Sequence, residues 1–233
     1  MQAFCDFDGT ISKRDVTDLV LGRFASPEWT KVEDLWVDGK ITAGECMQRQ
    51  IAMLDVSLEA LGAFLDTVEI DPKFDAFKRL CDDAGISITI VSDGVDFFIE
   101  RILAGHGITD IPVIANKLVV HSEPSGRTRF SLELPYADSA CLAGSGVCKC
   151  RVVRSAADAA ETKIYVGDGR SDFCVSNEPM FVYAKASLSE HCRENGIPFI
   201  AFKDFGDVTR SLQAFLNNAA RPLSMPVLSN SAS

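Results

Sequence analysis

Two aspartates lie one residue apart directly after the first apolar run of the chain, in the string Asp6-Phe7-Asp8-Gly9-Thr10. Gly9 allows the backbone to turn sharply here, so that the loop can wrap around a small volume. Two carboxylates held this close repel each other unless a cation lies between them. Mg²⁺ selects carboxylate oxygens, and we therefore expect Asp6 and Asp8 to be metal ligands and Thr10 to bind substrate beside them.

A second acidic group stands at residues 167–172, again after an apolar run, Lys163–Val166. Its first carboxylate, Asp168, could complete a metal site opposite Asp6. Asp172 lies one helical turn further on and could bind the ion or a water molecule on it. These carboxylates should converge, because ligands of open α/β sheets bind just beyond the carboxyl ends of the strands.

An anion-binding loop is predicted at Ser92-Asp93-Gly94, which closes the apolar run Ser87–Val91. The Ser92 hydroxyl and the backbone N–H groups that lead into the next helix can cradle a phosphate. Ser92 is also a suitable N-cap for that helix. We expect all three residues of this loop to bind substrate.

The positive charge of the site is assigned to Lys149, which precedes the strand before Asp168 and can return to the strand ends. Its expected role is to neutralise charge on a transferring phosphoryl group. A single lysine in a loop is usually a solvated charge, so Lys163 and Arg151 remain alternatives for this role.

Together these groups could catalyse phosphoryl transfer. Asp6 would attack phosphorus, while Asp8 would protonate the leaving alkoxide and then act as base on the water that cleaves the aspartyl phosphate. The first string alone could be an acidic turn, but four elements in order at strand ends favour catalysis. A phospho-accepting regulatory domain is the alternative from a different class. The chain length, the inserted helices and Asp8 argue against it.

Strand-like apolar runs alternate with helical patterns along most of the chain. This alternation predicts an α/β fold with a Rossmann-like, mostly parallel sheet core and helices on both faces. The candidate core strands are Gln2–Cys5, Ser87–Val91, Lys163–Val166, Met180–Tyr183 and Phe199–Ala201. A β-hairpin is also predicted, from Lys117–Val120 and Arg129–Leu134 around the turn at Pro124–Gly126.

Residues 12–71 break this alternation, because amphipathic segments at 16–24, 42–54 and 58–68 follow one another with no strand-like run. They predict a small all-helical cap domain above the carboxyl end of the first strand. We therefore expect a catalytic core of residues 1–11 and 72–218, a cap of residues 12–71, and a disordered tail of residues 219–233 that is rich in Ser and Pro.

Four strings of the chain, taken in order, resemble the four motifs of the haloacid dehalogenase superfamily: Asp6-x-Asp8-Gly9-Thr10, Ser92, Lys149 and Gly167-Asp168-x-x-x-Asp172. The helical insert resembles the type-1 cap of the phosphoserine-phosphatase-like branch. Within that branch the chain looks most like the methionine-salvage phosphatases that act on 2-hydroxy-3-keto-5-methylthiopentenyl 1-phosphate. Strings that carry this likeness include Ser26-Pro27-Glu28-Trp29, Gly94-Val95-Asp96-Phe97-Phe98 and Asp204-Phe205.

The resemblance implies an Mg²⁺-dependent phosphatase for a small phosphorylated metabolite, with methylthiopentenyl phosphate ahead of sugar phosphates, hydroxy-keto phosphates and phosphoamino acids such as phosphoserine. Three departures from phosphoserine phosphatases point away from phosphoserine. Asp15 stands where those enzymes carry Glu, Ser171 where they carry Asn, and Gln50 where they carry an Arg that grips the substrate carboxylate. Arg49 is next to Gln50 and could restore that contact.

The bulk composition restricts the partners. The formal net charge is −10 over 233 residues, so most of the surface would repel a polyphosphate backbone, and we expect no nucleic acid partner. No run approaches the roughly 20 apolar residues that span a bilayer, and no basic and apolar leader is visible, so we expect a cytoplasmic protein with no membrane partner. Nothing in the sequence indicates an oligomeric state.

Three of the eight cysteines, Cys141, Cys148 and Cys150, gather in a loop that contains Gly and Ser. A zinc site or a disulfide is conceivable there. Structural zinc usually has four ligands, however, and no His is nearby in the sequence, so a plain loop is the simpler interpretation. The other cysteines, Cys174 among them, are expected to be buried free thiols.

Overall fold

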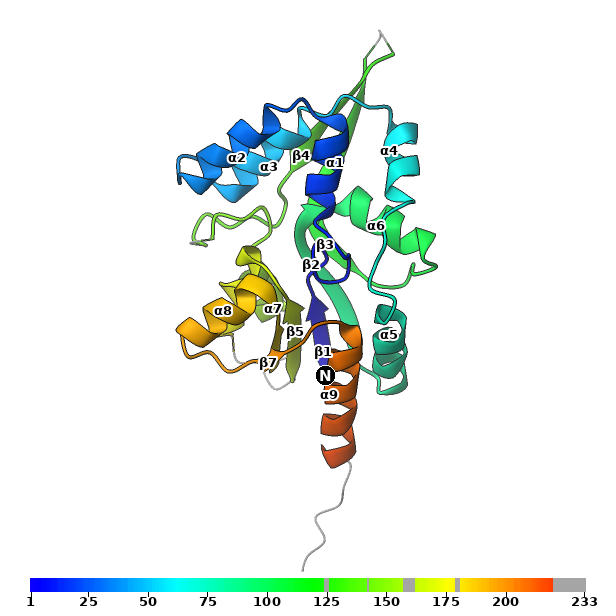
Figure 1. Ribbon diagram of the computed structural model, residues 1–233, viewed down its shortest axis with the longest axis vertical. Helices are drawn as coiled ribbons and strands as arrows, with labels where there is room; N and C mark the ends of the chain where they lie inside the picture. The colour runs from blue at the N-terminus through cyan, green and yellow to red at the C-terminus, as the bar shows by residue number, and fades with distance from the viewer. Residues whose placement is uncertain (124–125, 142, 157–161, 179–180, 220–233) are drawn as a thin grey trace, which may run out of the picture.

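One seven-stranded sheet organises the fold, with the strand order β4-β3-β2-β1-β5-β6-β7 (Figure 1). The computed structural model describes residues 1–123, 126–141, 143–156, 162–178 and 181–219. Neighbouring strands run parallel except β3 and β4, which are antiparallel, so the predicted α/β fold with a mostly parallel sheet is confirmed. The strands are β1 (Gln2–Cys5), β2 (Ser87–Val95), β3 (Val113–Ser122), β4 (Thr128–Glu133), β5 (Lys163–Gly167), β6 (Phe181–Ala184) and β7 (Ile200–Ala201).

The five predicted core strands correspond to β1, β2, β5, β6 and β7, with some ends shifted. Strand β6 begins at Phe181, and the predicted start at Met180 lies outside the described residues. Strand β3 begins earlier than the predicted hairpin, and its Val113 pairs with Ile90 of β2. The hairpin is therefore the edge of the main sheet, because the buried start of β3, which includes Ala115, packs in the core before the strand becomes exposed.

Strand β1 lies at the centre of the sheet, and its register aligns the ends of three strands. Cys5 pairs with Ile90 of β2 on one side and with Val166 of β5 on the other. The chain therefore leaves these strands at the same edge of the sheet. The Asp6 N–H still donates to the Val166 carbonyl oxygen at 2.9 Å, so the end of the sheet fixes the position of this aspartate.

Helices cover both faces of the sheet. The helices of the core are α5 (Phe74–Asp83), α6 (Asp96–Gly105), α7 (Lys149–Ser155), α8 (Ala186–Glu194) and α9 (Phe205–Ala219). Two 3₁₀ turns, η1 (Arg170–Asp172) and η2 (Val175–Asn177), follow β5. Alternate side chains of a strand point to opposite faces. Ala3 and Cys5 accordingly pack in a cluster with residues of α5, α6 and α9, whereas Phe4 packs in a cluster with residues of α7. The predicted two-sided covering is confirmed.

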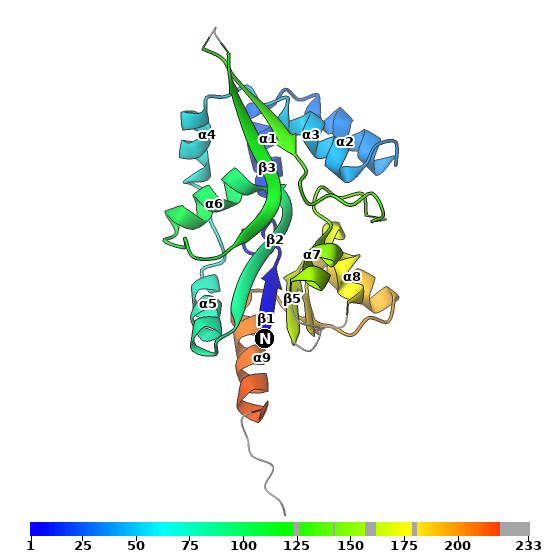
Figure 2. The same ribbon diagram turned by 180° about the vertical axis from the view of Figure 1, so that it is seen from behind.

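Four helices stand between β1 and α5: α1 (Val16–Phe24), α2 (Trp29–Val37), α3 (Ala43–Ile51) and α4 (Leu58–Leu65). Residues 12–71 are all described and contain no strand. Side-chain N-caps at Asp15, Thr42 and Ser57 begin three of these helices. Helix α2 was not expected from the sequence, and it has no fully buried residue. Figures 1 and 2 show these helices beyond the carboxyl end of β1.

The two segments that join these helices to the core lie side by side. Ser12 and Ile70 form an isolated antiparallel bridge, and the Asp71 N–H donates to the Ile11 carbonyl oxygen at 2.8 Å. The Asp71 carboxylate also accepts a hydrogen bond of 2.8 Å from the Phe205 N–H, at the start of α9. We propose residues 12 and 71 as the borders of the cap, with the C-terminal helix tied to its base.

The C-terminal part of the chain is helical for one residue more than expected. The predicted tail starts at Ala219, yet this residue ends helix α9. Residues 220–233, the rest of the predicted tail, lie outside the described residues. None of the helices within the described ranges is long and apolar enough to cross a bilayer.

Candidate active site

Three carboxylates meet where strands β1 and β5 end. One oxygen of each of Asp6, Asp168 and Asp172 lies within 4.8 Å of the others. Ligand oxygens around one Mg²⁺ stand about 3 to 4 Å apart at metal–oxygen distances near 2.1 Å, so the group fits a hard divalent cation. Gly9 makes the close approach possible, because it has φ +67° and a Cβ at this position would collide with the carboxylate of Asp168.

Lys149 supplies the positive charge of this group. It begins helix α7 and is fully buried, and its Nζ lies 2.8 Å from Asp6 Oδ2 and 2.6 Å from Asp172 Oδ1. Burial alone would lower the pKa of Lys149, but the carboxylates of Asp172 and Asp6 outweigh burial and hold this pKa above its ordinary value. The two alternatives have other partners. Lys163 Nζ donates to the Val153 carbonyl oxygen in helix α7, and Arg151 pairs with Asp138 in the loop before that helix.

Asp172 holds the lysine in place. Its Oδ1 accepts hydrogen bonds from Lys149 Nζ and, at 2.5 Å, from the Tyr165 hydroxyl. Its Oδ2 accepts hydrogen bonds from the N–H groups of Asp168 and Gly169 at 2.9 and 3.0 Å. These four donors occupy the four lone-pair positions of the carboxylate. We therefore propose for Asp172, in place of direct metal binding, the role of partner of Lys149.

Asp8 lies outside the group of three carboxylates, contrary to the metal role predicted for its side chain. Its Oδ1 accepts a hydrogen bond of 2.8 Å from the Val16 N–H, at the start of cap helix α1. Burial and the nearby carboxylate of Asp15 raise the pKa of Asp8 well above its ordinary value, against the opposing effect of that hydrogen bond. A carboxyl group with a raised pKa is suited to proton transfer near neutral pH.

Thr10 and Asp93 are predicted substrate ligands whose side chains already have protein partners. Thr10 Oγ1 donates to Asp168 Oδ1 at 2.6 Å and so orients a carboxylate of the metal-binding group. Asp93 Oδ1 accepts the Val147 N–H at 3.0 Å and lies 3.4 Å from Asn116 Nδ2. We therefore revise the role of both residues from substrate contact to the positioning of other groups.

Ser92 and Gly94 remain where a phosphate group is expected, because both border the cavity beside Asp8. Ser92 Oγ accepts the Gly94 N–H at 3.0 Å. A Cβ on Gly94 would collide with the Asp8 carboxylate, so only glycine permits this approach. The N-cap role predicted for Ser92 was wrong, since strand β2 continues to Val95, which itself precedes helix α6.

A cavity of about 890 Å³ is lined by residues of both the cap and the core. The cap wall includes Trp36 and Gln50, and no Lys or Arg of residues 12–71, all of them described, lines the cavity. Arg49 does not reach it, because its side chain is half-exposed and pairs with Glu45 at 2.5 Å. Gln50 is buried instead, and its Nε2 lies 3.3 Å from Glu33 Oε2.

Three residues of the site were missed in the sequence: Trp36, Tyr165 and Arg170. The Arg170 guanidinium lies 5.3 Å from the centre of the Trp36 ring and joins the η1 turn to cap helix α2. Tyr165 occupies a buried strand position, where an aromatic residue ordinarily signals packing. These residues act through contacts between distant segments, and no local spacing in the sequence could have indicated them.

Four cysteines, and not the predicted three, gather at the border of this cavity. Sulfur atoms of Cys141, Cys150 and Cys174 lie within 4.8 Å of one another, and Cys148 Sγ lies 3.4 Å from Cys150 Sγ. The eight cysteines are all free thiols in this structure. Cys174 was missed because it reaches the group from the η1–η2 segment, far along the chain.

The chain matches known phosphatases over most of its length. Residues 2–180 match the model of a family described as Putative Phosphatase. A 2-hydroxy-3-keto-5-methylthiopentenyl-1-phosphate phosphatase of Brevibacillus brevis is 33% identical over 213 residues, which cover 90% of this chain and 94% of that protein. The enzyme of the same name from Geobacillus kaustophilus is 32% identical over 215 residues, with the same shares covered, 90% and 94%.

Solved structures show the same fold. A structure of phosphoserine phosphatase that carries an analogue of its phospho-aspartyl intermediate superposes with a TM-score of 0.65, at 18% sequence identity. The match covers 90% of this chain and 97% of that one. At this identity the similarity concerns the fold, and its coverage extends beyond the sheet core to the helices above it.

Proposed function

Since the chain belongs to the Putative Phosphatase family, and with it to the haloacid dehalogenase-like phosphatases, we propose that it hydrolyses a small phosphate monoester with Mg²⁺ through an aspartyl phosphate on Asp6. The observation that carries this proposal is the buried contact of Asp6 with Lys149, at the meeting point of three carboxylates. This arrangement places a nucleophile beside a cation that can neutralise phosphoryl oxygens.

Asp6 is the proposed nucleophile because both of its oxygens are held in place. Its Oδ1 accepts the Phe7 N–H at 2.7 Å, and its Oδ2 faces Lys149. Burial and the Asp172 carboxylate raise the pKa of Asp6. The charge of Lys149 counteracts this effect and favours the ionised form that a nucleophilic attack requires.

Asp8 is the proposed acid and base. In the first step Asp6 attacks phosphorus, the bond from phosphorus to the leaving oxygen breaks, and the proton of Asp8 passes to that oxygen. In the second step Asp8 removes a proton from the water that attacks phosphorus, the Asp6–phosphorus bond breaks, and inorganic phosphate leaves. The raised pKa of Asp8 suits both steps, because the group must donate and then accept a proton at one pH.

Asp6 and Asp168 would hold Mg²⁺ through their carboxylate oxygens, and Asp172 would hold Lys149 beside them. When bound, the ion would neutralise negative charge on the phosphoryl group. Thr10 fixes one of these oxygens through its hydrogen bond to Asp168. The donor set consists of hard oxygen atoms, which is the set that Mg²⁺ selects.

We propose the methylthiopentenyl phosphate class as substrate, ahead of phosphoserine. The carboxylate of phosphoserine would need a positive partner on the cap wall, but Arg49 is turned away from the cavity and Gln50 stands in its place. An enol phosphate without a carboxylate has no such need. Trp36 and Met47 line the cap side of the cavity and offer apolar surface to a methylthio group.

Phosphate release from a panel of esters tests the substrate. The panel contains 2-hydroxy-3-keto-5-methylthiopentenyl 1-phosphate, phosphoserine and sugar phosphates, each assayed with Mg²⁺ and with EDTA. The first ester should show the highest kcat/KM, by at least about tenfold over phosphoserine. EDTA should abolish activity and added Mg²⁺ should restore it. Equal kcat/KM for phosphoserine would contradict the substrate assignment.

The nucleophile is tested separately, by Asp6→Asn and by an acid quench during turnover. Mass spectrometry of the quenched wild-type protein should locate the phosphoryl group on Asp6, and Asp6→Asn should be inactive. Asp82→Asn, on an exposed side chain of α5, is the matched control and should retain wild-type activity. Full activity of Asp6→Asn on a small ester would exclude Asp6 as the nucleophile.

A further inference from the structure

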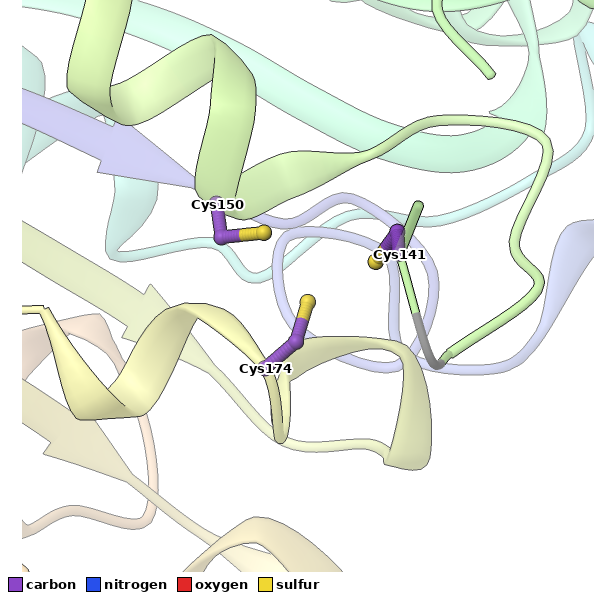
Figure 3. A group of neighbouring side chains, drawn as sticks. All are labelled: Cys141, Cys150 and Cys174. Atoms are coloured by element: carbon purple, nitrogen blue, oxygen red, sulfur yellow. The ribbon is translucent and has the colours of Figure 1, made fainter. Parts of the chain in front are cut away.

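We propose that Cys141, Cys148, Cys150 and Cys174 form a thiolate site for one zinc ion, next to the active site and separate from the carboxylates that would hold Mg²⁺. Figure 3 shows the sulfur atoms of Cys141, Cys150 and Cys174 pointing toward a common space from three different segments. These segments are the loop before α7, the first turn of α7, and the link between η1 and η2.

The spacing of the sulfur atoms fits a tetrahedral metal. Zinc binds thiolates at about 2.3 Å, which places the sulfurs of a tetrahedron about 3.8 Å apart. Three of the sulfurs are within 4.8 Å of one another. The fourth, of Cys148, is 3.4 Å from that of Cys150. Movements of about 1 Å would therefore bring the first three sulfurs to the distances that zinc requires, and the sulfur of Cys148 would move further to become the fourth ligand.

The chemistry of the group favours a soft or borderline metal. Thiolate ligands select zinc over Mg²⁺, whereas carboxylates select Mg²⁺. Cys148 and Cys150 are buried, and Cys141 and Cys174 pack against the same cluster of apolar side chains, which includes Val153 of α7. The group is thus apolar on one side, while the half-buried Cys141 and Cys174 border the cavity on the other.

The four cysteines lie close in the chain to Lys149 and Asp172 of the candidate active site. Cys148 and Cys150 flank Lys149 directly, and Cys174 stands two residues after Asp172. A shared ion would therefore join the start of helix α7 to the η1–η2 segment. It would fix the 2.6 Å contact between Lys149 and Asp172 from the border of the cavity, so that the cysteines are positioning residues for the lysine.

The experiment uses the full-length protein with all thiols reduced, and its readout is independent of phosphatase activity. Zinc content is measured after dialysis against zinc, and cobalt(II) is then substituted for zinc. We expect about one zinc ion per chain and the near-ultraviolet charge-transfer absorption of cobalt bound to thiolates. Cobalt on the carboxylates of the active site lacks this absorption, so Asp6→Asn should leave it unchanged.

Cys174→Ser and Cys141→Ser should each weaken zinc binding by at least about tenfold, since the loss of even outer-shell groups costs that much, and should remove the charge-transfer absorption. Cys46→Ser is the matched control for zinc binding. The Cys46 thiol lies outside the group and donates to the Val32 carbonyl oxygen, a bond that a serine hydroxyl can also make. Cys46→Ser should therefore bind zinc as the wild type does.

Three results would overturn the proposal. The first is wild-type protein that shows no cobalt–thiolate absorption although its thiols are reduced. The second is an absorption that survives both Cys174→Ser and Cys141→Ser. The third is a disulfide within the group, found by mass spectrometry of protein purified without reductant. If one of the two variants does not fold, the other variant and the wild-type titration still decide the question.

Discussion

Asp6 and Asp8 stand one residue apart, yet their carboxylates face different partners. Asp6 faces the ammonium of Lys149 at 2.8 Å, whereas Asp8 faces the Val16 N–H at the start of the cap. A full positive charge favours the carboxylate form far more than one amide does. Two aspartates in one short loop can therefore serve as nucleophile and as acid, because the environment of each assigns its protonation state.

The role of Asp8 predicts a dependence on the leaving group. Asp8→Asn should lower kcat for an alkyl phosphate by about 10²–10⁴-fold, because no proton reaches the leaving oxygen. The same variant should lose much less with p-nitrophenyl phosphate, since p-nitrophenolate leaves without a proton. Steady-state kinetics with both esters checks this. Equal losses with both would show that Asp8 is not the acid.

Asp8→Asn should also change the pH dependence of stability. Burial raises the pKa of Asp8 in the folded state, so the unfolded chain ionises first, from about pH 4. Wild-type protein therefore loses stability as the pH rises from there through the folded pKa of Asp8. Asp8→Asn cannot ionise and should be the more stable protein at pH 7, with no difference below pH 4. Urea unfolding at several pH values measures this, and a difference that does not change with pH would contradict it.

Lys149 is predicted to be essential for stability as well as for activity. Lys149→Met leaves the carboxylates of Asp6 and Asp172 buried without their cation, and should reduce the free energy of unfolding by roughly 3–5 kcal/mol. Lys163→Met is the matched control, because Lys163 donates only to a backbone carbonyl in the described contacts. Denaturant unfolding should show a much larger loss for Lys149→Met. Similar losses for both variants would contradict the ion-pair argument.

At the level of residues, the sequence predicted which groups would meet but not which bonds they make. Asp6, Asp168 and Lys149 could be predicted because each follows or precedes a strand end, and the ends of parallel strands share one edge. The side chains of Thr10 and Asp93 already have protein partners, which residue type alone does not reveal. Which hydrogen-bond partners a side chain has depends on tertiary contacts, and the spacing of residues in the sequence does not show these contacts.

Among the elements, cap helix α2 contacts the η1 turn, which follows Asp168 at the end of β5. Trp36 of α2 faces Arg170 of η1, and Trp36 also lines the cavity. Helix α2 buries none of its residues fully, so packing alone does not hold it in this position. The contact between Arg170 and Trp36 is therefore a specific connection between the cap and the metal-binding end of β5.

Trp36→Ala should raise KM by about 2- to 5-fold, which corresponds to the roughly 0.5–1 kcal/mol of an exposed cation–π pair. The value of kcat should change little, because the tryptophan does not touch the reacting carboxylates. Trp36→Phe keeps a ring and should retain most of the affinity. Val37→Ala, on an exposed neighbour in the same helix, is the control. A loss confined to kcat would contradict a role in substrate retention.

The prediction of elements succeeded for the central strands and failed for one cap helix and for the start of one strand. Strands β1 and β5 are buried on both faces and read as continuous apolar runs. Helix α2 was missed, and it has no fully buried residue. The start of β3 was missed as well, because it is defined by pairing with β2, on the other side of helix α6 in the sequence. Pairing between distant segments is not encoded in a local pattern.

The whole molecule carries a net charge of −10, and three carboxylates converge at its catalytic edge. Asp6, Asp168 and Asp172 meet one lysine there, so the folded state concentrates negative charge at this point. Binding of a cation to the folded state alone stabilises it. We therefore expect Mg²⁺ bound at this point to stabilise the folded state.

Mg²⁺ should stabilise the folded protein by about 2.7 kcal/mol when its concentration is 100 times the Kd. Asp168→Asn should be more stable than wild type without Mg²⁺, because one of the three repelling charges is gone, and should respond little to the ion. Asp82→Asn should respond as wild type does. Thermal melting with Mg²⁺ and with EDTA measures each case. An unchanged response of Asp168→Asn would remove this residue from the metal site.

The hydrogen bond from the Val16 N–H to Asp8 ties the chemistry of the core to the position of the cap. Any motion that carries the first turn of helix α1 away from the core takes this donor with it. The same motion removes the Asp15 carboxylate, the N-cap of this helix, and admits water to Asp8. Burial and Asp15 raise the pKa of Asp8 by more than the hydrogen bond lowers it, so the open state would favour the ionised carboxylate and closure would favour its protonation. The position of one helix would therefore decide when the acid of the first step is ready.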